Sequence, residues 1–371
     1  TADNATVVIE NCSFAGKVTS SEVKLGGLIG DAEKLSSLDI RNSYVDVELS
    51  YTGTTAVTGI GGLVGYSTAK LEATDCDNEA TGTVNFSAAE AELTELSVAG
   101  IAGRSYAKAV YTRCENLAPI TVAVKSAKAA HLAGIEGAPN SAAIGSTNGA
   151  STDSCVSKGT LTATGSALWY VGGVSSWGGV WTSTASSQMK ALNNVAECNI
   201  NVCVEGTTLG HYVGGIVGFS GLHTTVSGNS YKGAIKVGTN SSTVRSFVGG
   251  IVAAHTINQT SATSQKNGSF TFEGNVAEAD ITCGANANST YAGMILGGVD
   301  NVSTKEGSTF TKKSDVTVTY DDVNVNKVKS GCKLDGVAVT AETYLSLVMG
   351  SYNDAERFNL IENNRATVIF E

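Results

Sequence analysis

The sequence predicts an all-β protein, a β-solenoid of about eight irregular repeats of roughly 38 residues with a C-terminal cap of α+β or β structure. Three observations support this prediction. Glycine is abundant and proline scarce, with 43 and 2 residues among 371. A glycine-containing phrase recurs along the chain, and short alternating runs follow it. We expect residues 1–310 to form the solenoid and residues 311–371 the cap.

The composition excludes several classes of protein. Collagen needs glycine at every third position and abundant proline. A disordered chain is poor in apolar residues, whereas 42% of this chain is apolar. The net charge of −10 argues against a nucleic-acid partner. No run of about 18 apolar residues is present, so no transmembrane helix is expected. The chain begins with Thr1 and shows no signal peptide, and we take it to be trimmed.

The recurring phrase consists of an apolar residue, a Gly or Ala, a Gly and a second apolar residue. The second glycines of its copies are Gly27, Gly62, Gly100, Gly134, Gly173, Gly215, Gly250 and Gly293, a mean spacing of 38 residues over seven steps. Glycine suits a corner between strands because it tolerates positive φ and allows close backbone approach. Each strand is expected to pair with its equivalent one repeat away, at about 4.8 Å.

A second phrase follows each copy and begins with Asn or Cys. Its first residues are Asn42, Cys76, Cys114, Cys155, Asn194, Asn229 and Asn275. A residue that recurs once per repeat stacks on itself, so inward Asn side chains are expected to form a hydrogen-bonded ladder. Cysteine is small and often buried, which favours free, stacked thiols at the three Cys positions. A disulfide is the alternative, and a metal or catalytic role is a weaker one.

These phrases resemble a known family. Gly-Gly-Leu-Val-Gly-Tyr at 61–66 and Gly-Gly-Ile-Val-Gly-Phe at 214–219, together with Asn-Ser-Tyr-Lys-Gly-Ala-Ile-Lys-Val at 229–237, are similar to the GLUG repeat of large bacterial surface proteins. The resemblance covers residues from about 9 to 300. It implies a secreted or surface-anchored bacterial protein with an adhesive or scaffold role. The peptidase activity of some family members is not implied, because the chain has no His-Glu-x-x-His motif.

The last 61 residues differ in composition, since the glycine phrase is absent and charged residues are more frequent. Residues 315–320 and 365–370 read as strands, and residues 341–349 read as a short helix. Solenoids expose unpaired strand edges at their ends and need caps. The segment is therefore a candidate C-terminal cap.

Aromatic residues are rare, yet all three tryptophans fall close together. Trp169, Tyr170, Trp177 and Trp181 are the candidate ligand-binding residues, because aromatic rings give a large contact area for a sugar or a protein. The competing interpretation is structural, with the rings filling a widened coil or holding an insertion against the rod.

Acidic residues offer weaker candidates. Asp75, Asp77 and Glu79 could hold a calcium ion by ligand type, although the expected metal content is none. Asp75 with Asp77, or Asp321 with Asp322, could serve as the carboxylate pair of a glycosidase or lyase. No nucleophile stands at a recognised spacing from the four histidines, no nucleotide-binding motif is present, and no cofactor is expected.

These observations favour a non-enzymatic protein of the bacterial surface, secreted or anchored in the outer membrane, that binds a glycan or a protein of a host or neighbouring cell. A lipid or wall anchor would lie outside this sequence. Two alternatives remain open. One is a polysaccharide-active enzyme that uses a groove along the solenoid, and the other is a passive stalk.

Overall fold

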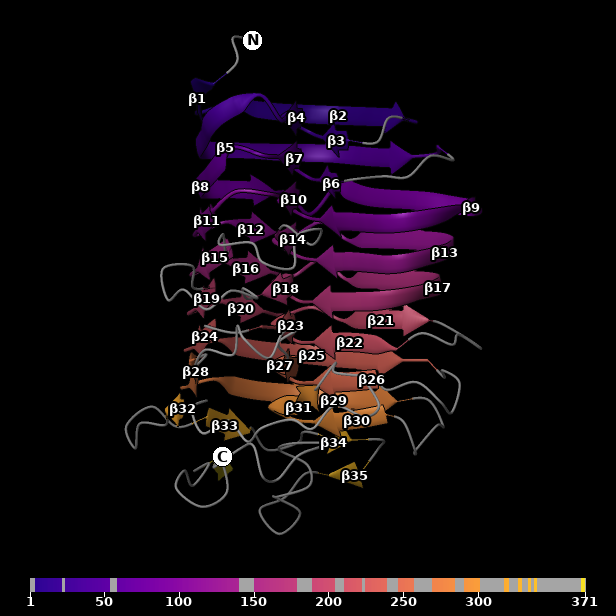
Figure 1. Ribbon diagram of the computed structural model, residues 1–371, viewed down its shortest axis with the longest axis vertical. Helices are drawn as coiled ribbons and strands as arrows, with labels where there is room; N and C mark the ends of the chain where they lie inside the picture. The colour runs from indigo at the N-terminus through magenta and orange to yellow at the C-terminus, as the bar shows by residue number, and fades with distance from the viewer. Residues whose placement is uncertain are drawn as a thin grey trace, which may run out of the picture.

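The computed structural model is a tall stack of strands with the chain termini at opposite ends (Figure 1). It describes residues 4–21, 24–53, 59–139, 150–178, 189–203, 210–221, 224–238, 246–256, 269–283 and 290–300, and short strands between 317 and 370. All regular elements among these residues are strands, in sheets of 28 and eight. The described part of the protein is therefore all-β. The helix expected at 341–349 lies outside the described residues.

One repeat contains four strands in sequence. In the middle of the stack these are β11 (Ala109–Thr112), β12 (Glu115–Asn116), β13 (Ile120–Ala133) and β14 (Glu136–Pro139). Strand β13 is long and reverses its direction halfway, at the right edge of the stack (Figure 1). Each strand pairs in parallel with its counterpart in the next repeat, namely β15 (Ala150–Asp153), β16 (Val156–Ser157), β17 (Leu161–Gly172) and β18 (Ser175–Gly178).

The other strands belong to three families. The first family comes first in each repeat. Besides β11 and β15 it contains β1 (Ala5–Glu10), β8 (Lys70–Asn78), β19 (Met189–Leu192), β24 (Thr224–Ser227) and β28 (Ser269–Glu273). The second family runs outward and then returns, in some repeats as one long strand and in others as separate strands. Its further members are β2 (Ser13–Ser20), β3 (Lys24–Gly26), β5 (Leu35–Tyr51, which also covers the first family), β6 (Gly59–Gly61), β9 (Thr83–Ala99), β20 (Val195–Ala196), β21 (Ile200–Cys203), β22 (His211–Gly214), β25 (Ser230–Val237), β26 (Ser246–Gly249), β29 (Val276–Cys283) and β30 (Thr290–Gly293).

The third family is the eight-stranded sheet, in which each strand follows one copy of the glycine phrase. Its members besides β14 and β18 are β4 (Ile29–Ala32), β7 (Val64–Ser67), β10 (Ala102–Ser105), β23 (Val217–Ser220), β27 (Val252–Thr256) and β31 (Leu296–Asp300). The phrase therefore marks the corner between the returning strand and this sheet. Two residues separate the strands at every such corner, for example Gly134 and Ile135 between β13 and β14.

Steric crowding explains the second glycine of the phrase. A Cβ atom on Gly100 would overlap the carbonyl oxygen of Gly134 in the next repeat and the side chain of Asn116 across the interior. Six further glycines of this column, from Gly27 to Gly250, meet the next repeat in the same way. Close approach is thus the reason for glycine here. The expectation that these glycines also use positive φ is wrong, because none of them has a φ in that region.

Positive φ occurs instead at a different corner, the one between the first and second families. The residues with left-handed backbone there are Asn11, Asn42, Asp75, Arg113, Ser154, Asn193, Gly228 and Gly274. Asn, Asp and Gly tolerate this conformation better than other residues do, which accounts for most of the column. Its recurrence in every repeat fixes the direction of the chain just before the buried Asn and Cys position.

The register corrects two of the expected repeat positions by one residue. Ser43 pairs with Cys76, so Ser43 holds the buried position and Asn42 is the exposed left-handed corner residue. Gly293 pairs with Gly249, the first glycine of its phrase, which places Met294 in the column of second glycines. Among the described residues no further repeat stacks on Met294, so the overlap that demands glycine elsewhere does not arise.

The buried column just after the left-handed corner holds asparagines in one half and cysteines in the other. The Asn194 amide donates to Asn229 Oδ1, and the Asn229 amide donates to Asn275 Oδ1, both at 2.9 Å. Cys76, Cys114 and Cys155 occupy the same column in preceding repeats, fully buried, and each Sγ lies 3.2–3.7 Å from backbone carbonyl oxygens. These three thiols, as well as Cys12, Cys198 and Cys203, are free rather than bridged.

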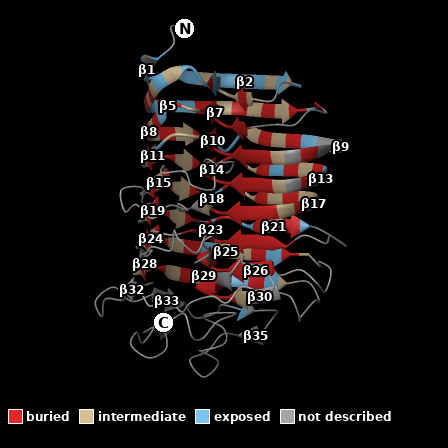
Figure 2. Ribbon diagram, in the orientation of Figure 1, coloured by how far each residue is buried: buried red, intermediate tan, exposed pale blue. Residues whose placement is uncertain are grey.

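The apolar core runs the length of the stack inside the strand families. Inner strands are buried, whereas β1 and β2 at the N-terminal end are mostly exposed (Figure 2). At the opposite end, β32 (Thr317–Thr319) pairs with β28, and β33 (Asn326–Val328) and β34 (Lys333–Leu334) pair with β29. Strand β35 (Val337–Ala338) is antiparallel to β34, and β36 (Val368–Phe370) pairs with β33. The strands expected within 315–320 and 365–370 are thus present in shortened form.

Candidate functional site

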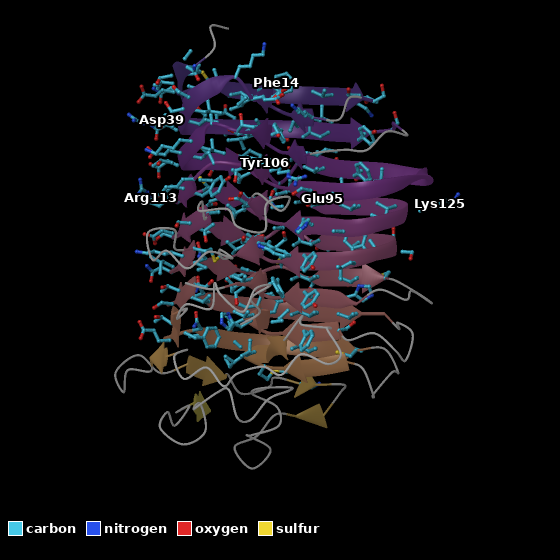
Figure 3. The ribbon with its side chains drawn as sticks, in the orientation of Figure 1. Phe14, Asp39, Glu95, Tyr106, Arg113 and Lys125 are labelled. Carbon is cyan, nitrogen blue, oxygen red and sulfur yellow. The ribbon has the colours of Figure 1, made fainter. Side chains whose placement is uncertain are left out.

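A line of large side chains follows the outer junction between the returning strands and the eight-stranded sheet. We call it the seam and define it by Tyr66, Glu95, Arg104, Tyr106, His131, Tyr170, Trp177, Tyr212, Phe219 and Phe247. Successive repeats supply its members because strand pairing places His131, Tyr170, Tyr212 and Phe247 in one column. Glu95 and Tyr106 are labelled in the upper half of the stack in Figure 3.

The C-terminal half of the seam is aromatic. His131 stacks on Tyr170 with ring centroids 4.9 Å apart, and Tyr170 stacks on Tyr212 at 5.0 Å. Trp177 and Phe219 cross these rings edge-on, with Trp177 4.8 Å from Tyr170 and Phe219 5.0 Å from Tyr212. Edge-to-face and offset contacts of this kind add stability beyond the buried area. Only Trp177 among these rings is more than marginally exposed.

The N-terminal half of the seam is charged. Arg104 is buried, binds Glu95 through Nη2 at 2.8 Å and lies over the Tyr106 ring at 4.7 Å. His131 Nε2 lies 3.8 Å from Glu95 Oε1. Burial, with Arg104 nearby, lowers the pKa of His131 to about 3. The imidazole is therefore neutral at physiological pH, and the contact with Glu95 is not an ion pair.

Ser176, His131 and Glu95 stand in the order of a hydrolase triad, but the geometry does not support nucleophilic catalysis. Ser176 Oγ lies 3.2 Å from His131 Nδ1 and donates its own proton to the Gly137 carbonyl oxygen. His131 must then donate to Ser176, the reverse of what a general base does. Ser176 is also fully buried. The two contacts of Ser176 tie β18 to β13 and β14.

The structure separates the four expected aromatic ligand-binding residues. Trp169 is fully buried in the main core, where its Nε1 donates to Gly165 O at 3.1 Å, so its ring faces no solvent. Tyr170 points to the other side of β17 and is almost buried in the seam. Trp177 is half-buried beside it. Trp181 lies outside the described residues. Trp177 is the described member with ring surface left for a partner.

The acidic candidates do not form a metal site. Asp75 is held by Arg113 through two hydrogen bonds of 2.7 Å, and this pairing lowers the pKa of Asp75. Asp77 faces Glu115 of the next repeat instead, in register on the adjacent strand. No group of three or more His, Cys, Asp or Glu in the described part of the chain is arranged to hold a metal ion. Asp321 and Asp322 lie outside that part.

Glu136 and His211 are two of the buried ionisable residues that were not expected from the sequence. Glu136 lies in an inward column that otherwise contains Ile29, Val64, Ala102, Ser175, Val217, Val252 and Leu296. Ser105 donates to Glu136 Oε1, and burial raises the pKa of this carboxyl to about 7. His211 stacks in register on Trp169 in the main core, and burial lowers its pKa to about 4.

Comparisons with known proteins add no relative. No protein-family model matches the chain, and searches of curated proteins and of solved structures found no match. The similarity to GLUG repeats stays a prediction. In the part of the chain that the structure describes, no helix has the length and apolar character needed to cross a membrane.

Proposed function

We propose that the chain is a non-enzymatic β-solenoid of the GLUG type that displays variable segments for adhesion at a bacterial surface. In this proposal each four-strand repeat is one coil, and residues 311–371 form the cap. The parallel register over successive repeats, the ladder of Asn194, Asn229 and Asn275, and the continuous core support the solenoid.

The observation that carries the display function is where the chain varies in length. The glycine corner always holds two residues between strands, and the left-handed corner either holds two or lies within one continuous strand, as in β5 and β8. Two of the other connections vary in length. Residues 68–69 link β7 to β8, whereas residues 140–149, 179–188 and 257–268 make the same connection in later repeats. The outward bend varies less, by a few residues; the strand is continuous there in β9, β13 and β17 but interrupted between β21 and β22 and between β25 and β26.

A scaffold under selection for shape alone has no need of such variation at two edges, whereas loops placed by a rigid scaffold commonly carry binding residues. Trp177 adjoins the 179–188 connection, which also contains Trp181. The expected ligand is a glycan or a protein of another cell, recognised by these rings. The expected location is extracellular, by secretion or by anchoring to the surface.

A glycan array screened with four forms of the protein tests this function. The forms are wild type, Trp177→Ala, a variant with residues 179–188 replaced by Thr-Ala as at 68–69, and the control Thr162→Ala. Binding that is lost in the Trp177 and loop variants and kept in the control supports glycan adhesion. Binding unaffected by both changes contradicts the assigned edge. No binding to any glycan or cell surface favours a passive stalk.

One observation favours the second candidate, a polysaccharide-active enzyme. Asp77 and Glu115 lie on adjacent strands, and burial together with the charges of Glu115 and Glu79 raises the pKa of Asp77 to about 6. A carboxyl with a raised pKa next to a second carboxyl is the arrangement of a glycosidase acid and its partner. Turnover of a polysaccharide by wild type that Asp77→Asn abolishes would establish this function instead.

A further inference from the structure

Three thiols lie next to one another inside the stack. Cys76, Cys114 and Cys155 occupy successive repeats of the buried column that follows the left-handed corner, and the strand register on both sides of each cysteine places them opposite one another. All three side chains are fully buried, and none is in a disulfide. Ser43 holds the preceding position of the column and Asn194 the following one. The run of adjacent thiols is therefore three repeats long.

The register brings neighbouring thiols of this run within the reach of a disulfide. Residues in register on adjacent strands have Cα atoms about 4.8 Å apart, and a disulfide spans Cα separations of about 4.4–6.8 Å. The thiols of Cys76 and Cys155 both lie within hydrogen-bonding reach of the Cys114 thiol. Cys76 and Cys155 themselves are two strand spacings apart, about 9.6 Å, which is too far for a bridge. Any disulfide within the run must therefore include Cys114.

The surroundings of the thiols give Cys76 and Cys114 different reactivity. A hydrogen bond from the Cys114 thiol lowers the pKa of Cys76. Hydrogen bonds with the thiols of Cys155 and Cys76, together with burial, raise the pKa of Cys114. The thiolate is the nucleophilic form of cysteine. Cys76 is thus the thiol that reacts first with an oxidant, and Cys114 is the thiol that then reacts with Cys76.

We propose that Cys76, Cys114 and Cys155 form a two-electron redox site, in which a peroxide oxidises the run to one disulfide that always includes Cys114. The Cys76 sulfur attacks an oxygen of hydrogen peroxide, the O–O bond breaks, and a sulfenic acid and one water form. The Cys114 sulfur then attacks the Cys76 sulfur, and the hydroxyl leaves with the Cys114 proton as a second water. The two thiols lose two electrons, and the peroxide is reduced to water. Hydrogen peroxide is close to water in size and reaches the run through local opening of the repeats.

The third thiol distinguishes this site from a simple pair. The Cys155 sulfur lies on the side of Cys114 opposite to Cys76, so it attacks the Cys114 sulfur of the disulfide and releases Cys76 as a thiol. The disulfide thus exchanges between two positions, and one thiol stays free. Either position joins consecutive repeats covalently and closes a loop of about 40 residues, which stabilises the stack against unfolding. The redox site does not depend on the adhesive function.

Oxidation of the folded protein by hydrogen peroxide, followed by alkylation and peptide mass spectrometry without reduction, tests the proposal. Four cysteines that do not belong to the run are replaced by Ser in every form, namely Cys12, Cys203, Cys283 and Cys332. Trypsin separates the three cysteines of the run into peptides 71–104, 114–125 and 129–158. We expect the loss of two thiols per chain and linked peptides that always include 114–125. A link between 71–104 and 129–158, or no loss of thiols, would overturn the proposal.

Serine variants of the run locate the disulfide. Serine already occupies this column at Ser43, so it suits the position. Cys76→Ser and Cys155→Ser each keep one adjacent pair and should still lose two thiols, whereas Cys114→Ser should form no disulfide. Ser43→Cys added to Cys114→Ser places a thiol opposite Cys76 and should restore the disulfide. An equal disulfide yield in all three single variants would contradict the proposal. Should Cys114→Ser fail to fold, the linked peptides of the unvaried run decide alone.

Discussion

The side-chain amide of Asn229 donates to Oδ1 of Asn275 at 2.9 Å, although the two residues are 46 positions apart in the chain. The same Oδ1 accepts from the Asn229 backbone N–H at 3.1 Å. Asn229 and Asn275 thus each accept from both a side-chain amide and a backbone N–H of the preceding repeat. These two hydrogen bonds to one oxygen hold one repeat against the next.

Removing the middle asparagine should destabilise the fold. In Asn229→Ala the backbone N–H and the amide of Asn194 both lose their acceptor, Asn229 Oδ1. A buried group left without a partner costs about 1–3 kcal/mol, so we expect a loss of at least that size in the free energy of unfolding. Urea denaturation measures it. Asn201→Ala, on the outer side of β21, is the control and should change stability by less than about 0.5 kcal/mol.

Gly100→Ala tests the steric explanation of the glycine phrase. The new methyl group would overlap Gly134 O and Asn116, both in packed surroundings. We expect a loss of about 3 kcal/mol or more, or failure to fold. Gly30→Ala is the matched control, because its Cβ would meet Lys24 O at 3.1 Å and no other residue closely. Equal stability of Gly100→Ala and wild type would show that close approach is not the reason for glycine.

Glu136 should make stability fall with rising pH. Burial raises the pKa of its carboxyl from an ordinary value of 4.5 to about 7. The folded state therefore holds this proton more tightly than the unfolded state does. Its stabilising contribution is complete below the ordinary pKa, declines as the pH rises to the folded pKa, and is lost above it. The full change is about 3 kcal/mol.

Thermal unfolding of wild type and Glu136→Gln between about pH 4 and pH 8 measures this contribution as a difference. Glutamine keeps the shape of a protonated carboxyl and cannot ionise. We expect the stability advantage of Glu136→Gln to grow across the interval. A difference that is constant with pH would mean that Glu136 is ionised in the folded protein, contrary to its burial.

His211 should be replaceable by an apolar residue with a gain in stability. It is fully buried, and neither ring nitrogen has a hydrogen-bond partner among the described residues. Burial lowers its pKa from 6.5 to about 4, so wild type loses stability as the pH falls through this interval. His211→Leu should gain about 1 kcal/mol at neutral pH and remove the part of the acid destabilisation that comes from His211. His255→Leu, which loses its 2.9 Å contact with Ser220, should instead destabilise the protein.

The repeat pattern made much of this fold predictable. A recurring phrase every 38 residues with alternating runs predicts stacked parallel strands, and the eight-stranded sheet has one strand per copy. The one-residue displacement of Asn42 was harder to see, because two similar polar residues stand side by side at that corner. Only the positive φ of Asn42 and the pairing of Ser43 with Cys76 separate their roles.

The buried Glu136 and the arrangement of the seam residues could not be predicted from the repeat pattern. Glu136 interrupts an apolar column, so Leu-Ala-Gly-Ile-Glu-Gly at 132–137 carried a signal that alignment of the copies could have revealed. The seam joins residues from different repeats, such as Tyr212 and Phe219 with Trp177, and depends on which face of a strand each occupies. Arg113 in a left-handed conformation follows from its neighbours in the column rather than from its own preference.

The spacing along one outward column tests the central claim most directly. Thr19, Ser50, Asn85, Thr121, Thr162, Asn201, Lys236 and Thr282 pair successively, one per repeat. Spin labels at Thr19 and Thr282, in a background with Cys12, Cys203, Cys283 and Cys332 replaced by Ser, should lie about 34 Å apart, seven strand spacings of 4.8 Å. Labels at Thr19 and Thr162 should lie about 19 Å apart, four spacings. Pulsed dipolar distances that grow by this fixed step per repeat are what a stacked solenoid predicts. Distances that do not increase with the number of repeats between the labels would contradict it.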